Sequence, residues 1–198
     1  MSTVKSKQLQ VGTSATSTDN FTIYQPATPD GTLRIGVGNA DNPTEVGRFN
    51  SNGYVATNAP AFSAYRSTTQ SISSATQTKI QFNGEQFDVN NCFDSTTNYR
   101  FTPNVAGYYQ INSSMNSGAS TSPTEVSLTI YKNGSVAYYG GYLAASSTIK
   151  SSPNVSALVY CNGTTDYIEI YAYIVASSAA IEGSSPYNTW ITGHLVSV

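Results

Sequence analysis

The sequence predicts an all-β protein, and three observations support that prediction. Asn-Gly pairs, the strongest short-range signal for a hairpin turn, occur at residues 52–53, 83–84, 133–134 and 162–163. Apolar and polar residues alternate just before the third pair and just after the fourth, and a period of two indicates antiparallel strands with one buried face. No segment of the sequence shows a sustained helical periodicity.

The N-terminal residues 1–59 differ in pattern from the rest. Short strands are expected at 21–24 and 33–37, separated by Pro26, Pro29-Asp30-Gly31 and Asn42-Pro43. These strands are too short and too poor in apolar residues to bury a core within one chain. We place a boundary near residues 56–60, with a docking segment and β-stem at 1–59 and a head at 60–198; a disordered leader is the alternative for 1–59.

Two strands in the head carry the clearest alternation. The apolar residues of the first alternate with Ser127, Thr129 and Tyr131, and they are Val126, Leu128 and Ile130. The apolar residues of the second alternate with Tyr167, Glu169, Tyr171 and Tyr173, and they are Ile168, Ile170, Ala172 and Ile174. The second aliphatic set suits the space between the two sheets of a sandwich.

Composition limits the function classes. Only 10% of the 198 residues are charged and the net charge is −2, so uncharged hydroxyls and amides must keep the surface hydrated. This pattern is common in extracellular and virion fibres. There is no cluster of Lys and Arg, which argues against a nucleic-acid partner. No apolar run approaches the roughly 18 residues of a membrane span, and the polar start MSTVKSKQLQ does not read as a secretory signal, so no membrane insertion is expected.

Residues that could support catalysis or bind a cofactor are scarce. The single histidine, His194, falls in a predicted strand, and the sequence has no Gly-x-Ser-x-Gly nucleophile motif. Asp88, Asn90 and Asp94 offer oxygen ligands, but their spacing does not fit an EF-hand loop, so solvated loop acids are the default interpretation. We therefore expect no enzyme, no catalytic residue, no metal and no cofactor.

The two cysteines are Cys92 and Cys161. In a chain expected to be made in a cytosol, two unpaired thiols are the simplest interpretation, and a disulfide remains the alternative.

Three blocks of sequence follow one another in a recognisable order. They are FDVNNCFDSTTNYRFTPNVAGYYQINSSM at 87–115, LVYCNGTTDYIEIYAY at 158–173 and WITGHLV at 190–196. In this order they resemble the globular head of complement component 1q, whose fold is shared with tumour necrosis factor. The sequence departs from that pattern where Thr97-Asn98 replaces Thr-Gly. The resemblance implies a jelly-roll sandwich of ten strands at 60–198, assembly as a homotrimer and a binding role.

A second resemblance lies in the N-terminal part. The run GTLRIGVGNADNPTEVGRFNSNGYVAT at 31–57 resembles the stem repeats of bacteriophage tail fibres, in which three chains wrap together and bury one another's small apolar faces. The resemblance implies a trimeric fibre stem. Residues 1 to about 10, with Lys5 and Lys7, are then the segment expected to dock to other virion proteins.

The tyrosines indicate two further sites. Tyr138, Tyr139 and Tyr142 surround Gly140-Gly141, and with Tyr187 and Asn188 they are candidate ligand-binding loop residues, because tyrosine gives contact area at low entropic cost. Packing within the trimer is the alternative role for these tyrosines. Glu169, Tyr171 and Tyr173 are expected at the trimer interface, since neighbouring exposed aromatics usually mark one.

Together these observations predict a trimeric bacteriophage virion fibre or knob. It would be made in the cytoplasm of the host bacterium, and its head would recognise a receptor or glycan on the host-cell surface. The alternatives are a capsid decoration or head-fibre protein with a structural role, and a non-viral complement-like binding module.

Overall fold

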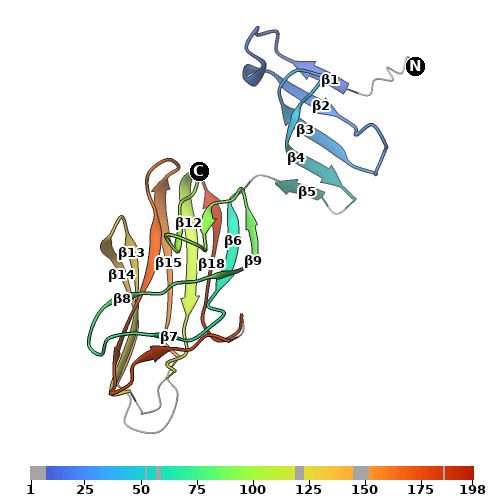
Figure 1. Cartoon of the computed structure of the whole chain (residues 1–198). Coiled ribbons are helices and arrows are strands. Elements are labelled where there is room, and N and C mark those ends of the chain that lie inside the picture. Colours follow the sequence, from blue (N-terminus) through green and yellow to red (C-terminus); the bar gives the residue numbers. More distant parts are fainter. Residues whose placement is uncertain (1–7, 52, 57–58, 119–122, 145–151, 185) are drawn as a thin grey trace. The chain divides into compact units, whose positions relative to one another are not determined.

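The structure is a computed structural model that describes residues 8–51, 53–56, 59–118, 123–144, 152–184 and 186–198 (Figure 1). The chain divides into two compact units, Met1–Asn58 and Ala59–Val198, which we call the stem and the head. Lys5 and Lys7, the predicted docking residues, lie outside the described residues. Among the residues described, no helix is long and apolar enough to cross a membrane.

The stem is one antiparallel sheet whose strands follow chain order. Its strands are β1 (Gln8–Val11), β2 (Phe21–Tyr24), β3 (Leu33–Val37), β4 (Thr44–Asn50) and β5 (Gly53–Ala56), and a 3-10 turn, η1 (Ser17–Asp19), precedes β2. The strands expected at 21–24 and 33–37 are confirmed. Strand β1 covers Gln8–Val11, so it overlaps the end of the expected docking segment, residues 1 to about 10.

The head is an all-β sandwich of two main sheets, which confirms the predicted jelly-roll class. The first sheet has the order β15 (Asn154–Asn162), β12 (Ala106–Ser114), β18 (Trp190–Ser197), β6 (Ala61–Tyr65) and β9 (Gly84–Val89). Figure 1 shows these five strands side by side. The second sheet has the order β10 (Phe93–Asp94), β11 (Arg100–Phe101), β16 (Ile168–Val175), β13 (Glu125–Lys132) and β14 (Ser135–Ala144), with β8 (Thr78–Lys79) also paired to β16.

A small additional sheet pairs β7 (Gln70–Ser71) with β17 (Ala180–Ile181). The two main sheets contain five and six strands among the described residues, against the ten expected in total. The chain crosses between the main sheets from β12 to β13, from β14 to β15 and from β15 to β16. These crossings are what place strands far apart in sequence next to one another.

The core lies between the two main sheets. The predicted inward face of β16 is confirmed, because Ile168, Ile170, Ala172 and Ile174 are all fully buried. Tyr109 and Ile111, from β12 of the first sheet, belong to the same buried core. At one end, the Phe62 ring stacks on the rings of Phe93 and Phe101, with centroids 4.8 and 4.5 Å apart. Burial of these large side chains is the main force that holds the sheets together.

Two of the Asn-Gly pairs form different kinds of connection. Asn133 and Gly134 both adopt positive φ, 53° and 75°, and form the predicted tight hairpin between β13 and β14. The hairpin expected at Asn162-Gly163 is wrong, because β15 and β16 belong to different sheets. There the Asn162 side chain accepts hydrogen bonds from the backbone N–H groups of Thr164, Thr165 and Asp166, which shapes a longer crossing loop.

Both cysteines are buried and unpaired, as the simpler interpretation predicted. Burial raises the pKa of the Cys92 thiol and raises the pKa of the Cys161 thiol to about 11. Both groups are therefore protonated near neutral pH and serve as small apolar core residues.

Candidate functional site

The outward face of the second sheet carries a cluster of tyrosines. Val126, Leu128 and Ile130 of β13 point inward and are fully buried, so Ser127, Thr129 and Tyr131 point outward. Residues from the strands on both sides share this outward face. We call it the tyrosine face, and its aromatic members are Tyr131, Tyr139, Tyr142, Tyr171 and Tyr173.

Strand register arranges four of these tyrosines in two rows across three strands, and Tyr131 lies next to the second row. In the first row, Ser127 of β13 pairs with Tyr142 of β14 and with Tyr173 of β16. In the second row, Thr129 pairs with Tyr139 and Tyr171 on the same two strands. A short hydroxyl side chain thus lies between two tyrosines in each row, because neighbouring strands are about 4.8 Å apart.

The central residue of the second row is shielded from solvent, and the central residue of the first row is partly accessible. Thr129 is only 1% exposed, although it is on the outward face, so neighbouring side chains cover it. Its hydroxyl has no hydrogen-bond partner in the described part of the chain. The ring of Tyr171 stacks on Tyr131, with centroids 3.9 Å apart. Ser127, in contrast, is only partly buried, so a polar group remains accessible between Tyr142 and Tyr173.

Charged groups around the tyrosine face are paired. Lys79 Nζ donates to Glu169 Oε1 at 2.9 Å and to the Asn98 carbonyl oxygen at 2.9 Å. The Arg100 guanidinium lies 4.1 Å from the ring centroid of Tyr167, in a cation–π contact. Desolvation, and next the nearby Glu125 carboxylate, raise the pKa of Tyr142, which places Glu125 beside this ring. The face therefore presents rings and hydroxyls, with the Glu125 carboxylate beside Tyr142.

The predicted trimer-interface residues lie on this face. Glu169 is buried, and its basic partner is Lys79 of the same chain. Tyr171 and Tyr173 lie on the outward face as expected, and each is partly buried within the subunit. Desolvation, followed by the Glu169 charge, raises the pKa of the Tyr171 hydroxyl. Their position at an interface between subunits stays a prediction.

The predicted ligand-binding loop around Gly140-Gly141 is a strand. Tyr139 and Tyr142 lie within β14, and they are 78% and 59% exposed. A Cβ atom at Gly140 would come within 2.5 Å of the Val155 Cβ atom, so glycine is needed for the close approach of the next strand, not for flexibility. Tyr138 is turned away, and its hydroxyl donates to the Leu158 carbonyl oxygen at 3.1 Å.

The other candidate ligand residues lie elsewhere on the head. Tyr187 is 83% exposed and lines a shallow pocket next to the first sheet, together with Ser63, Gln86, Pro186, Trp190 and Thr192. The Asn188 side-chain amide donates to the Ser184 hydroxyl at 3.0 Å. The structure thus brings Tyr139 and Tyr142 together with Tyr171 and Tyr173, but not with Tyr187 and Asn188.

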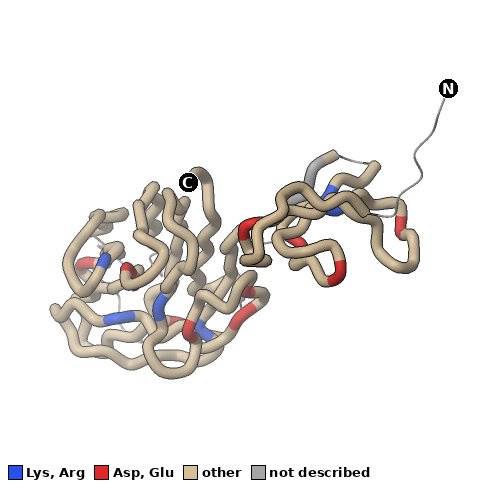
Figure 2. Tube along the Cα trace, turned by 90° about the horizontal axis from the view of Figure 1, so that it is seen from above, with Lys and Arg blue, Asp and Glu red and all other residues tan. Residues whose placement is uncertain are grey.

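Sequence reasoning missed a second surface, the outward face of the first sheet. Strands β15, β12, β18 and β6 contain no Lys, Arg, Asp or Glu, and His194 is their only ionisable side chain apart from tyrosines and Cys161. This first-sheet face exposes Tyr108, Leu158 and Tyr160 by 44–48% each. Tyr108 and Tyr160 pack edge to face across β12 and β15, with centroids 5.4 Å apart. Figure 2 shows how few charged residues the chain carries.

No protein-family model matches the chain, and no curated protein matches it. Similarity appears only among solved structures. Murine APRIL at pH 8.5 matches with 11% identity and a TM-score of 0.52, over 70% of this chain and 99% of that one. The globular domain of the zebrafish complement 1qA protein matches with 18% identity and a TM-score of 0.51, over 70% and 97%. The Eiger TNF of S. frugiperda matches with 9% identity and a TM-score of 0.50, over 70% and 93%.

The chain has a complement 1q/TNF-like jelly-roll fold. At these identities the likeness concerns the fold alone.

The acidic residues considered as metal ligands in the jelly roll hold turns instead. Asp94 accepts hydrogen bonds from the backbone N–H groups of Thr97, Thr96 and Asn98, and these bonds hold its pKa well below the usual range. Asp88 Oδ2 accepts from the Phe93 N–H group at 2.8 Å. The described residues contain no group of three His, Cys, Asp or Glu side chains that could hold a metal ion.

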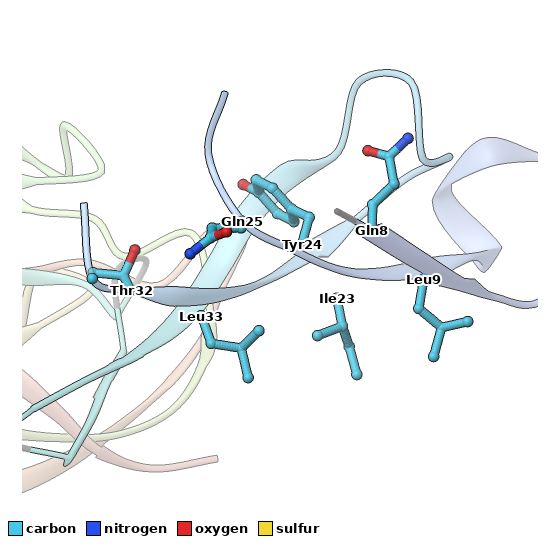
Figure 3. Close-up of a pocket in the computed structure, with 8 residues that line it drawn as sticks. Gln8, Leu9, Ile23, Tyr24, Gln25, Thr32 and Leu33 are labelled. Carbon is cyan, nitrogen blue, oxygen red and sulfur yellow. The ribbon is translucent and has the colours of Figure 1, made fainter. Parts of the chain in front are cut away.

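The stem presents a third surface. Leu9, Ile23 and Leu33 project from the same side of the sheet and line a shallow pocket (Figure 3). Register extends this apolar face to further exposed side chains, which are Val11, Phe21 and Phe49. The opposite side carries the ionic residues, where Arg34 pairs with Asp30 and Glu45, and Arg48 pairs with Glu45.

Proposed function

We propose that this chain is the subunit of a homotrimeric bacteriophage virion fibre or knob, and that its jelly-roll head recognises the host-cell surface. The observation that carries the proposal is the stem, a single-layer sheet with one largely apolar face among the residues that the structure describes. Exposed side chains on that face include Leu9, Phe21 and Leu33, each 48–60% exposed. A sheet with an uncovered apolar face gains stability when other chains cover it.

The first-sheet face supports assembly of the head. It has exposed aromatic and aliphatic side chains, and four of the sheet's five strands, all but β9, lack charged residues, as the core of an oligomer interface does. We propose that subunits meet through Tyr108, Leu158 and Tyr160. The tyrosine face, on the opposite side of the sandwich, then stays available to a ligand. This differs from the sequence-based prediction, which put Tyr171 and Tyr173 at the interface.

The virion assignment rests on the likeness of residues 31–57 to fibre stem repeats and on the charge-poor composition. The fold alone fits a non-viral complement-like binding module as well. A capsid decoration protein would share the stem and the trimer but would not bind cells. The proposal assigns no catalytic step to the chain.

Three measurements test the proposal. Sedimentation of the full-length chain should give the mass of three subunits, and a stable monomer at micromolar concentration contradicts the trimer. Purified protein, added to host cells before infection, should block virion adsorption. Antibody labelling of virions distinguishes a tail fibre from a capsid decoration, and unblocked adsorption together with capsid labelling would favour the decoration role.

A further inference from the structure

The tyrosine face has the composition of a surface for a small polar ligand with apolar faces. Its aromatic members are all tyrosines, and its central strand contributes the hydroxyl residues Ser127 and Thr129 between them. A tyrosine offers a flat apolar ring with a hydroxyl at its tip, so it contacts C–H groups and hydrogen-bonding groups of one ligand together.

The size of the surface also limits the ligand. Its two rows lie two residues apart along β13, and each row spans three strands. Those spacings correspond to an area of about 7 by 10 Å. The patch matches a ligand of one or two sugar rings.

The charged residues around the tyrosine face bear on the charge of its ligand. Glu169 is neutralised by Lys79 at 2.9 Å, and Glu125 contacts the Tyr142 hydroxyl. Lys79 is held by Glu169, so this pair offers no free cation to an acidic ligand. The Glu125 carboxylate keeps its charge beside Tyr142 and can accept a hydrogen bond from a sugar hydroxyl. A neutral ligand pays the smallest desolvation penalty at such a surface.

We infer that the tyrosine face binds a neutral pyranose-containing glycan. In this inference, which rests on the proposed function, the rings of Tyr142 and Tyr173 lie on either side of the sugar. Ser127 lies between them and hydrogen-bonds a sugar hydroxyl. Tyr131, stacked on Tyr171, stiffens the neighbouring row so that the rings need little reordering on binding.

The test uses the full-length protein and a panel of neutral oligosaccharides built from glucose, galactose, mannose and N-acetylglucosamine. Binding is measured by saturation-transfer NMR and by titration calorimetry. At least one member should bind saturably. Tyr142→Ala and Tyr173→Ala should each weaken that binding about tenfold or more, as expected for truncating a central aromatic contact. Tyr142→Phe, which keeps the ring, should weaken it less.

Phe87→Ala is the control, because Phe87 is an exposed aromatic residue on β9 of the first sheet, and its loss should leave the affinity unchanged. Thermal melting of each variant checks that the fold is kept. The inference is overturned if no panel member binds at millimolar concentration, or if Tyr142→Ala and Tyr173→Ala bind like the unaltered protein.

The adsorption assay separates this inference from the proposed function. If both variants still block virion adsorption fully, the host is recognised elsewhere, and the glycan inference fails while the proposed function stands. If treating cells with protease, and not with glycosidase, abolishes head binding, the ligand is a protein and the inference fails as well. If the unaltered head neither binds cells nor blocks adsorption, the proposed function itself fails.

Discussion

Tyr131 and Tyr171 stack across the neighbouring strands β13 and β16, with ring centroids 3.9 Å apart and planes inclined by 26°. They are not directly paired, since Tyr131 pairs with Glu169 and Tyr171 pairs with Thr129. The contact is therefore a diagonal one, which only long side chains make. It ties the outer surface of two strands together and helps to cover Thr129.

Replacing Tyr171 by alanine should destabilise the head by about 1–2 kcal/mol, because the stack is lost and Thr129 is exposed. Tyr139→Ala is the matched control. Tyr139 also pairs with Thr129 but is 78% exposed, so its loss should cost less. Urea unfolding of the two variants at equal protein concentration measures the difference. Equal losses of unfolding free energy for both variants would contradict the structural role of the stack.

Local sequence patterns predicted local structure well. The alternation in β16 correctly identified its buried residues, since a period of two is a property of the strand itself. The Asn133-Gly134 hairpin was predictable for the same reason, because the pair tolerates the two positive φ angles. The Asn162-Gly163 pair has the same sequence but crosses between sheets, and only the distant strand partners decide that difference.

For the candidate site, the sequence identified individual residues but not the face that they share. Tyr142 and Tyr173 were each noticed in the sequence, but for different roles. They share one face because β14 and β16 both pair with β13. The β13–β16 pairing joins Ser127 to Tyr173, 173 − 127 = 46 residues apart, and no local pattern encodes it. Gly140-Gly141 was read as a flexible loop, since the close approach of Val155 that requires glycine there is also a long-range property.

Acid should weaken the head in part through Asp94. Hydrogen bonds from the backbone N–H groups of Thr97 and Thr96 lower its pKa below the ordinary value of 3.8. The unfolded chain therefore takes up a proton at a higher pH than the folded chain does. The stability that Asp94 contributes is present above pH 3.8 and is lost as the pH falls through its folded-state pKa.

The Asp94→Asn variant checks this sign. It should be less stable than the unaltered protein near neutral pH. The difference in unfolding free energy between the two proteins should become smaller below pH 3.8. Denaturant unfolding of both proteins, near neutral pH and below pH 3.8, measures this difference in unfolding free energy. A difference that stays constant or widens on acidification would show that the Asp94 carboxylate does not carry the acid sensitivity.

Removing residues 1–7 should leave the trimer intact and prevent its incorporation into virions. This segment contains Lys5 and Lys7 and ends just before β1, so its deletion spares the stem sheet. The Lys5→Ala, Lys7→Ala double variant tests whether the charges alone account for docking. Sedimentation reports the trimer and immunoblotting of purified virions reports incorporation. Normal incorporation of the truncated chain would refute a docking role for this segment.

Two pairs of tyrosines give opposite predictions for the trimer interface. If subunits meet through the first-sheet face, a carboxylate introduced there by Tyr160→Asp becomes buried at the interface. The nearby cation, Lys132, already pairs with Asp166, so the change should disfavour assembly. Tyr108, which packs against Tyr160, would lose its neighbour as well. The variant should then sediment as a monomer at concentrations where the unaltered chain is trimeric, while its circular dichroism spectrum remains that of a β-protein.

The Tyr171→Ala, Tyr173→Ala double variant is the counterpart on the other side of the sandwich. If the first sheet forms the interface, this variant should remain trimeric and only melt at a lower temperature. The reason is that the contacts it loses lie within each subunit and not between subunits. If instead it dissociates while Tyr160→Asp stays trimeric, the interface is at Glu169, Tyr171 and Tyr173, as the sequence pattern predicted. The tyrosine face would then be buried in the trimer, and the glycan inference would fail with it.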